Sequence, residues 1–308
     1  MEIKLSYKLN KLLSIKDLEN HVPEKDYFVG IDSDGTVFNS MELKHKDCFV
    51  GCLIRSFSFA PIAHEVHLVW NYVNILSKTR GTNRFKALIL TFDYLSKMER
   101  VIKLGINIPK VDSIRNWLTL NKPLTNEKLK KIIFDSKEDE KFYLETVLNW
   151  SVDVNKTVKK TVFNLPPMKG ALNAISNLRK YADIVVVSNT PVKTLNREWA
   201  ENNIKSKVLY IGGQETGTKT EMLNAVAKNK YNNENILIIG DSLGDLNAAK
   251  NINALFFPIL PLREEDSWKI FNQKGLQYFF EGNYSGEFEN KQIENFHSTL
   301  NIKPHWLD

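Results

Sequence analysis

The stretch Tyr27–Phe38, YFVGIDSDGTVF, decides how the rest of the chain is interpreted. Its first five residues, Tyr27–Ile31, have the length and apolar composition of a fully buried β-strand. Asp32 and Asp34 follow directly, on a turn that continues Gly-Thr. Two carboxylates at the end of a buried strand repel each other and lose water, which disfavours their ionised forms unless a cation or a substrate compensates. An ordinary Asp-Gly turn is the simpler interpretation, and this segment alone does not decide between the two.

The second half of the chain alternates between apolar runs and helical patterns. Runs rich in Ile and Val predict strands at Ile184–Val187, Val208–Ile211, Ile236–Ile239 and Ala254–Phe257. Helical spacing predicts helices at about 169–180, 192–203, 220–229 and 245–250. This alternation is typical of a parallel sheet that is covered by helices on both faces, and the strand at Tyr27–Ile31 belongs to the same sheet. The predicted fold class is α/β, with a Rossmann-like parallel-sheet core.

The block between these two parts has a different character. From about residue 39 to 163 apolar residues recur at helical spacing, as in Val66, Val69, Trp70 and Val73, and no alternating strand pattern is present. We therefore predict a helical domain at 40–163, inserted into a core formed by 1–39 and 164–308. A short lead-in helix is expected near 9–20, and a tail helix near 266–279.

Composition limits the classes of protein. The 308 residues are 43% hydrophobic and 25% charged, which is typical of a folded protein with one large or two moderate domains. The net charge of +6 comes from lysines spread along the chain, so it does not favour nucleic acid and suits a small anionic substrate equally well. Cys48 and Cys52 form no disulfide framework, and no apolar run reaches the roughly 18 residues of a membrane span. We expect a cytoplasmic protein without a membrane partner.

Polar residues follow three of the predicted strands. They are Asp32 and Asp34, Ser188 and Asn189, and Asp241, with Asp245 one helical turn later. Ligands of open parallel sheets bind at the carboxyl ends of the strands. Four carboxylates at one edge predict a hard divalent cation, and Mg²⁺ commonly combines one or two carboxylates with substrate phosphate. The pattern therefore indicates phosphoryl chemistry.

The ordered set DSDGT, IVVVSNT, a lysine and IIGDSLGD resembles the haloacid dehalogenase superfamily of hydrolases. The resemblance covers about residues 25–40 and 165–260, and the inserted block corresponds to a helical cap placed after the first strand. It implies that Asp32 is the nucleophile that forms an aspartyl-phosphate, and that Asp34 is the general acid and base. It also implies that Ser188, with Asn189 beside it, binds the phosphoryl group.

The same resemblance implies a Mg²⁺ ion held by Asp32, the Asp34 carbonyl and Asp241. Asp245 would bind the ion through water or orient the lysine. The lysine is expected to be Lys219, which opens the helix before the Asp241 strand, and Lys193 is the rival.

The motifs leave more than one reaction open. Asp34 argues against dehalogenases and phosphonate-cleaving members, which lack this aspartate. Phosphomutases share every motif seen here, and a catalytically silent binding protein is a further alternative. The paired acids Asp32 and Asp34 argue against a catalytically silent protein. The prediction is therefore a magnesium-dependent phosphatase of a small phosphorylated metabolite.

One stretch of the helical block is a candidate for substrate binding. Between two amphipathic helices lies Lys78–Arg84, in which Arg80, Asn83 and Arg84 can hold a phosphate or a polyhydroxylated group. A solvated turn between helices is the alternative. His64 and His67 do not match the HExxH pattern of zinc sites and are not expected to bind metal.

Overall fold

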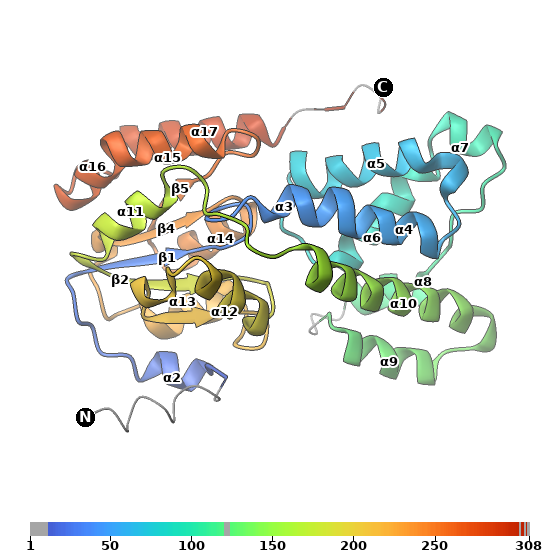
Figure 1. Ribbon diagram of the computed structural model, residues 1–308, viewed down its shortest axis with the longest axis horizontal. Helices are drawn as coiled ribbons and strands as arrows, with labels where there is room; N and C mark the ends of the chain where they lie inside the picture. The colour runs from blue at the N-terminus through green and yellow to red at the C-terminus, as the bar shows by residue number, and fades with distance from the viewer. Residues whose placement is uncertain (1–11, 120–123, 302, 305, 307–308) are drawn as a thin grey trace. The chain divides into compact units, whose positions relative to one another are not determined.

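The computed structural model describes residues 12–119, 124–301, 303–304 and 306, and the chain divides into two compact units (Figure 1). The first unit is Met1–Asn39 with Asn164–Thr299, and the second is Ser40–Phe163 with Leu300–Asp308. The tail from Leu300 therefore groups with the helical unit, although the sequence assigned it to the core.

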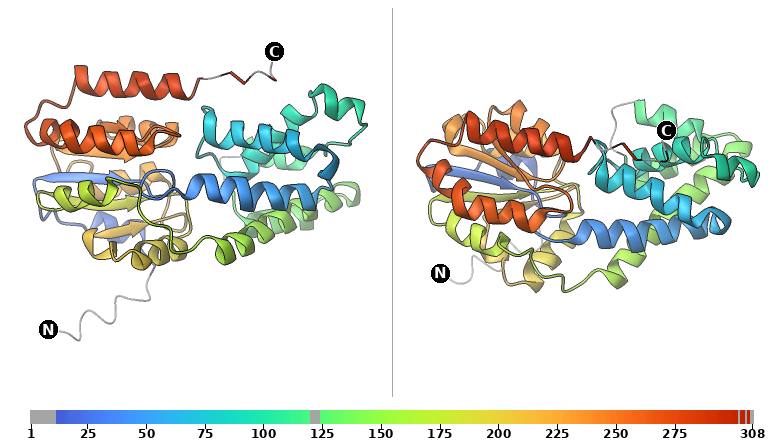
Figure 2. Two further views of the ribbon diagram at one scale, coloured as in Figure 1. Left: turned by 45° about the horizontal axis from the view of Figure 1, so that its top comes forward. Right: turned by 90° about the horizontal axis from the view of Figure 1, so that it is seen from above.

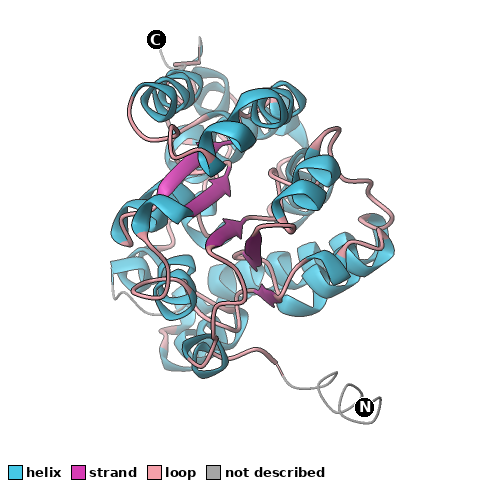
Figure 3. Ribbon diagram, turned by 90° about the vertical axis from the view of Figure 1, so that its left-hand side faces the viewer, coloured by secondary structure: helices cyan, strands magenta, loops and turns pink. Residues whose placement is uncertain are grey.

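The first unit is built on five parallel strands in the order β3-β2-β1-β4-β5. Figure 3 draws the strands in magenta. The strands are β1 (Tyr27–Ile31), β2 (Ala182–Val187), β3 (Tyr210–Gly212), β4 (Ile236–Gly240) and β5 (Leu255–Pro258). The central strand is β1, whose Ile31 pairs with Val186 of β2 and Ile239 of β4. Because β1 has neighbours on both sides, its carboxyl end lies beside those of β2 and β4.

Helices cover both faces of this sheet (Figure 2). On one face Val29 and Ile31 belong to a hydrophobic cluster that includes residues of α11 (Ala171–Leu178) and α12 (Val192–Glu201). On the other face a Cβ added at Gly30 would lie 2.7 Å from Leu223, a residue of α13 (Lys219–Val226). The predicted α/β fold is thus confirmed, and Gly30 is the residue that lets α13 pack closely on β1.

The predicted elements of this unit are present, with shifted ends. The strand predicted at Val208–Ile211 begins at Tyr210, and the one predicted at Ala254–Phe257 begins at Leu255. Within the described residues, the remaining helices before the tail are α2 (Ile15–Glu19), α14 (Leu243–Asn251) and the short 3-10 helices η5 (Lys205–Lys207) and η6 (Asn233–Asn235). Residues 9–11 of the predicted lead-in helix lie outside the described residues. The tail holds α15 (Glu264–Ile270), a π-helical stretch η7 (Phe271–Gly275), α16 (Leu276–Phe280) and α17 (Glu287–Thr299). A tail helix was therefore foreseen near 266–279, but α17 was not.

Every regular element in the described part of 40–163 is helical. The longer helices are α4 (Val50–Ser56), α5 (Ala63–Asn71), α6 (Arg84–Leu95), α8 (Asp112–Thr119), α9 (Asn126–Asp135) and α10 (Glu138–Thr161). Shorter elements are α3 (Ser40–Leu43), η2 (Lys44–Phe49), η3 (Ala60–Ile62), η4 (Tyr72–Leu76) and α7 (Glu99–Lys103). The interior contains Trp70 and Trp150, which contact each other edge to face, and in the tail the Trp306 ring contacts Tyr72 and Tyr94. Within the described residues, no helix has the length and apolar character needed to cross a membrane.

A buried hydrogen-bonded chain fixes the segment that leads into β1. His21 Nε2 lies 2.8 Å from Tyr231 Oη, which donates to Asp183 Oδ2 at 2.7 Å. The same Asp183 oxygen accepts the backbone N–H groups of Glu24 and Lys25. Burial lowers the pKa of His21 below its usual value of 6.5, an effect that the Asp183 carboxylate opposes. His21 is therefore neutral in the folded protein at neutral pH.

The lowered pKa of His21 predicts a pH-dependent contribution to stability. Below about pH 6.5 the unfolded chain binds a proton at His21 more readily than the folded chain, so acidification favours unfolding. The contribution is complete above the unfolded pKa and is lost as pH falls through the lower folded value. Urea unfolding at pH 7.5 and 5.5 should show a larger loss of free energy for the wild type than for His21→Gln. Equal losses would contradict the assignment.

Candidate active site

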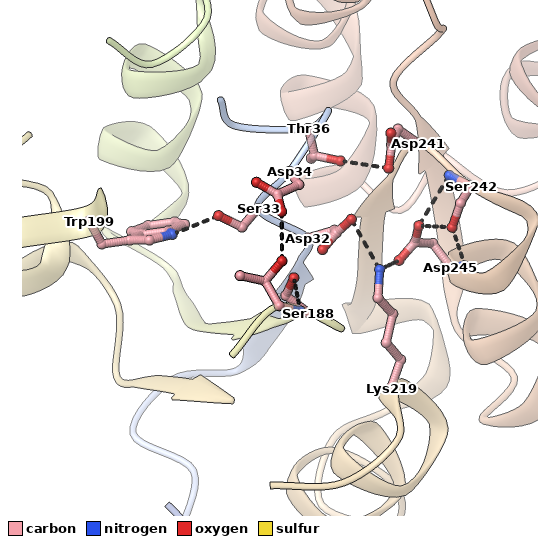
Figure 4. A network of polar contacts seen from close by, with 11 residues as sticks. Asp32, Ser33, Asp34, Thr36, Ser188, Trp199, Lys219, Asp241, Ser242 and Asp245 are labelled. Atoms are coloured by element: carbon pink, nitrogen blue, oxygen red, sulfur yellow. Dashed lines mark hydrogen bonds and ion pairs between the residues drawn. The ribbon is translucent and has the colours of Figure 1, made fainter. Parts of the chain in front are cut away.

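The carboxyl ends of β2, β1 and β4 bring the polar residues of three motifs together (Figure 4). The backbone N–H of Asp32 donates to Ile239 O at 3.0 Å, which continues the sheet pairing into the first motif. Ser188 follows β2, and its N–H donates to Gly212 O at 3.1 Å. Asp241 follows β4 directly. The strand order therefore gathers residues that are more than 200 positions apart along the chain.

Three buried carboxylates form a group that suits a hard cation. Asp32, Asp241 and Asp245 each offer an oxygen within 4.8 Å of the others, and within the described residues this is the one such group of His, Cys, Asp or Glu. Asp32 Oδ1 is buried and has no hydrogen-bond partner in the described structure. A buried carboxylate oxygen without a partner is costly, so this oxygen fits a ligand role toward Mg²⁺.

Lys219 supplies the positive charge at this site. Its Nζ lies 2.6 Å from Asp245 Oδ1 and 3.0 Å from Asp32 Oδ2, and the side chain is buried. Burial lowers the pKa of Lys219, but the carboxylates of Asp245 and Asp32 outweigh burial and raise the pKa above its usual value. The rival Lys193 is exposed. Of the two lysines, Lys219 is the one that the fold places among the carboxylates.

The electrostatics of Asp32 follow from the same contacts. Burial raises the pKa of the Asp32 carboxyl well above its usual value, and the Lys219 ammonium opposes this rise. The carboxylates of Asp245 and Asp241 add to the rise because they repel a further negative charge. The ionised form of Asp32 therefore depends on positive charge at the site.

Asp245 is held from two sides. Its Oδ2 accepts both the N–H of Ser242 at 3.1 Å and the Ser242 hydroxyl at 2.6 Å, in a capping box that opens α14. A Cβ added at Gly240 would lie 2.3 Å from Asp245 Cγ, so only glycine leaves room there. Ser242 was not among the predicted site residues, although the Ser-x-x-Asp pattern within GDSLGD is the sequence signal of this capping box.

Asp34 has a different surrounding from the three clustered carboxylates. Its Oδ2 accepts a hydrogen bond from Thr190 Oγ1 at 2.6 Å. The N–H of Thr190 also donates to Ser188 Oγ, so the threonine connects the first and second motifs. Thr190 is the last residue of the motif IVVVSNT but was assigned no role, whereas Asn189, the predicted contact beside Ser188, is exposed. Thr36 Oγ1 was missed as well, and it lies 3.5 Å from Asp241 Oδ1.

Arg80, Asn83 and Arg84 make contacts within the helical unit. Asn83 caps α6 by accepting the N–H of Phe85, and Arg80 is buried and donates to Ile75 O. The Arg84 guanidinium donates to Asn155 Oδ1 at 2.7 Å and lies over the ring of Phe49. Burial lowers the pKa of Arg84 to about 10. These contacts account for all three side chains inside the unit, and their role toward a substrate stays a prediction.

His64 and His67 are exposed on α5, outside the one group of clustered metal-ligating side chains found among the described residues.

Residues 86–259 match the family described as haloacid dehalogenase-like hydrolase. The matched residues include Ser188, Lys219, Asp241 and Asp245, whereas Asp32 and Asp34 precede them. No curated protein matches the chain.

Several solved structures are similar to this chain. A predicted phosphoglycolate phosphatase from Haemophilus somnus 129pt is 14% identical, with 82% of this chain and 99% of that chain covered and a TM-score of 0.44. A haloacid dehalogenase-like family hydrolase from Streptococcus pneumoniae is 14% identical, with 82% and 98% covered and a TM-score of 0.40. A haloacid dehalogenase-like family hydrolase from Xanthomonas campestris is 10% identical, with 83% and 97% covered and a TM-score of 0.40.

The parallel sheet, the acidic site at its carboxyl edge and the family match define a hydrolase of the α/β class. The chain belongs to the haloacid dehalogenase-like hydrolases, as the resemblance of its motifs implied.

The position of Lys219 predicts a large stability difference between two lysine substitutions. Lys219→Met leaves Asp32 and Asp245 buried without their counter-charge, which should cost about 3–5 kcal/mol of unfolding free energy. Lys193→Met removes an exposed lysine and should change this free energy by less than about 0.5 kcal/mol. Urea unfolding in buffer with EDTA measures both, since EDTA prevents a metal ion from replacing the lost charge. Equal stability of the two variants would rule out the buried ion pairs.

Proposed function

We propose that the protein is a magnesium-dependent phosphatase that hydrolyses a small phosphorylated metabolite through an aspartyl-phosphate on Asp32. The observation that carries this proposal is the pairing of Asp32 with Lys219 at 3.0 Å, while the other Asp32 oxygen is buried and unpartnered. One oxygen is thereby oriented by a cationic side chain, and the other is left available.

Asp32 and Asp241 would hold the magnesium ion, together with the backbone carbonyl of Asp34. Asp245 is already engaged by Lys219 and Ser242, so it would act on the ion through water and chiefly orient the lysine. A bound Mg²⁺ neutralises charge on the transferring phosphoryl oxygens.

Asp32 begins the reaction as the nucleophile. Its carboxylate attacks phosphorus and displaces the alcohol oxygen of the substrate, so that a carboxyl–phosphate bond replaces the ester bond. Lys219 stabilises the ionised carboxylate before the attack and the charge on the phosphoryl oxygens during it. The Ser188 hydroxyl is buried at the carboxyl end of β2, the strand that pairs with β1, and donates to a phosphoryl oxygen.

Asp34 moves the protons. It protonates the leaving oxygen in the first step, and it then accepts a proton from the water that attacks the aspartyl-phosphate, which restores Asp32. Thr190 Oγ1 donates to Asp34 Oδ2, which orients the carboxyl group for this role.

The helical unit at Ser40–Phe163 would act as the cap that selects the substrate. Its position in the sequence, directly after the first motif, supports this role. Arg84 supports it further, because its guanidinium is partly buried beside neutral acceptors and an aromatic ring, and such a cation suits an anionic group.

Asp32→Asn should abolish turnover. The substitution keeps the shape of the side chain but removes the nucleophilic carboxylate, so hydrolysis of para-nitrophenyl phosphate should fall by at least about 10³-fold. Wild-type turnover should require added MgCl₂ and stop with EDTA. Asp266→Asn, an exposed carboxylate on α15, is the matched control and should keep wild-type activity. Turnover that survives Asp32→Asn would refute the assignment of Asp32 as the nucleophile. Turnover that is insensitive to EDTA would refute the requirement for magnesium.

A further inference from the structure

The residue between the two catalytic aspartates contacts a buried tryptophan. Ser33 Oγ accepts a hydrogen bond of 3.0 Å from the indole Nε1–H of Trp199, a residue of α12 (Figure 4). Both side chains have no exposed surface. The two residues are 166 positions apart, so this contact forms only when α12 packs on the sheet. Neither residue has a role in the proposed chemistry.

Ser33 is also the residue on which the catalytic turn closes. Its carbonyl accepts the backbone N–H groups of Thr36, Val37 and Phe38. Gly35 completes the turn with a positive φ of 74°, a conformation that glycine adopts without strain. Because Ser33 is bonded covalently to both Asp32 and Asp34, a displacement of Ser33 moves both carboxylates.

A second indole donor holds the other end of the same turn. Trp268 Nε1 donates to the backbone carbonyl of Thr36 at 2.8 Å, from α15 in the tail. Like Trp199, this tryptophan is fully buried. Two helices outside the catalytic motifs therefore each direct one N–H group at the turn that carries Asp32 and Asp34.

Packing alone does not account for the Trp199 contact. The Trp199 ring meets Phe38 edge to face, with ring centroids 5.9 Å apart, and a phenylalanine ring can make the same kind of contact. The hydrogen bond is additional, and it has a direction, because an indole N–H can only donate. A buried serine hydroxyl without a hydrogen-bond partner destabilises the folded state, so the Trp199 N–H stabilises Ser33 at this position.

We infer that Trp199 is a positioning residue that acts through Ser33 to set the places of the nucleophile Asp32 and the acid–base Asp34. The inference rests on the proposed phosphatase function. Catalytic rates depend steeply on placement, since a shift of about 1 Å can cost about 100-fold in rate. Loss of the hydrogen bond should therefore lower kcat with little change in KM.

The test is a double-mutant cycle with para-nitrophenyl phosphate and MgCl₂. Trp199→Phe removes the donor and keeps a ring beside Phe38, and Ser33→Ala removes the acceptor with a smaller change in volume. Each should lower kcat by about 10- to 100-fold, and the double variant should lose no more than the single ones, because both remove one interaction. Tyr284→Phe is the matched control, since it removes a buried hydrogen bond of 3.1 Å to Phe256 O in the same unit and should leave kcat unchanged.

A spectroscopic measurement tests the contact without activity. In protein labelled with ¹⁵N-tryptophan, Trp199→Phe identifies the Trp199 indole signal among those of six tryptophans. That signal should exchange slowly with solvent and should shift in Ser33→Ala. A rapidly exchanging signal that does not shift would overturn the inference.

The kinetic outcomes separate this inference from the function on which it rests. Matched, non-additive losses of kcat in variants that still fold support positioning. Lowered melting temperatures with unchanged kcat would show that the contact is only structural and would overturn the inference alone. A folded wild type without turnover would overturn the proposed function, and this inference with it. If Trp199→Phe does not fold, Ser33→Ala against Tyr284→Phe decides between the same outcomes.

Discussion

The burial of negative charge at one edge of the sheet is the constraint on which the site depends. Asp32, Asp241 and Asp245 are nearly inaccessible to water and lie within 4.8 Å of one another, and Lys219 is the cation that pairs with two of them. The clustered carboxylates repel one another, which favours the protonated form of Asp32, and the Lys219 ammonium opposes this effect. A divalent cation would offset further negative charge at this edge, which supports the metal-assisted reaction proposed above.

The surrounding fold is arranged to tolerate that charge. Asp245 lies in the first turn of α14, where free backbone N–H groups and the helix dipole favour a carboxylate, and Ser242 completes the cap. Gly240 leaves room for the Asp245 side chain, and Gly30 lets α13 approach β1, so that Lys219 at its first turn reaches Asp32. Gly240 and Gly30 therefore contribute both to the packing of the core and to the geometry of the site.

The helical unit has an aromatic interior, in which Trp70 and Trp150 contact each other. Its polar residues Asn83 and Arg84 make contacts within the unit: Asn83 caps α6, and Arg84 donates to Asn155. The tail adds Trp306 to this unit beside Tyr72 and Tyr94, although the helix before it, α17, belongs to the core. The aromatic character of the tail was visible in the sequence, but its destination was not, because any apolar surface can bury a tryptophan.

By itself the sequence determined the architecture and the main acidic residues. Continuous runs of Ile and Val identify the buried strands. Because parallel strands have their carboxyl ends at one edge of the sheet, Asp32, Ser188 and Asp241 were predicted to lie close together. The motif resemblance already favoured Lys219 over Lys193, and the structure places Lys219 beside Asp32 and Asp245. Only the tertiary structure shows that Thr190 donates to Asp34 and that Trp199 donates to Ser33. The last two contacts join residues 156 and 166 positions apart. Local patterns of hydrophobicity and capping carry no information about such distant partners, because these contacts depend on how whole helices pack against the sheet.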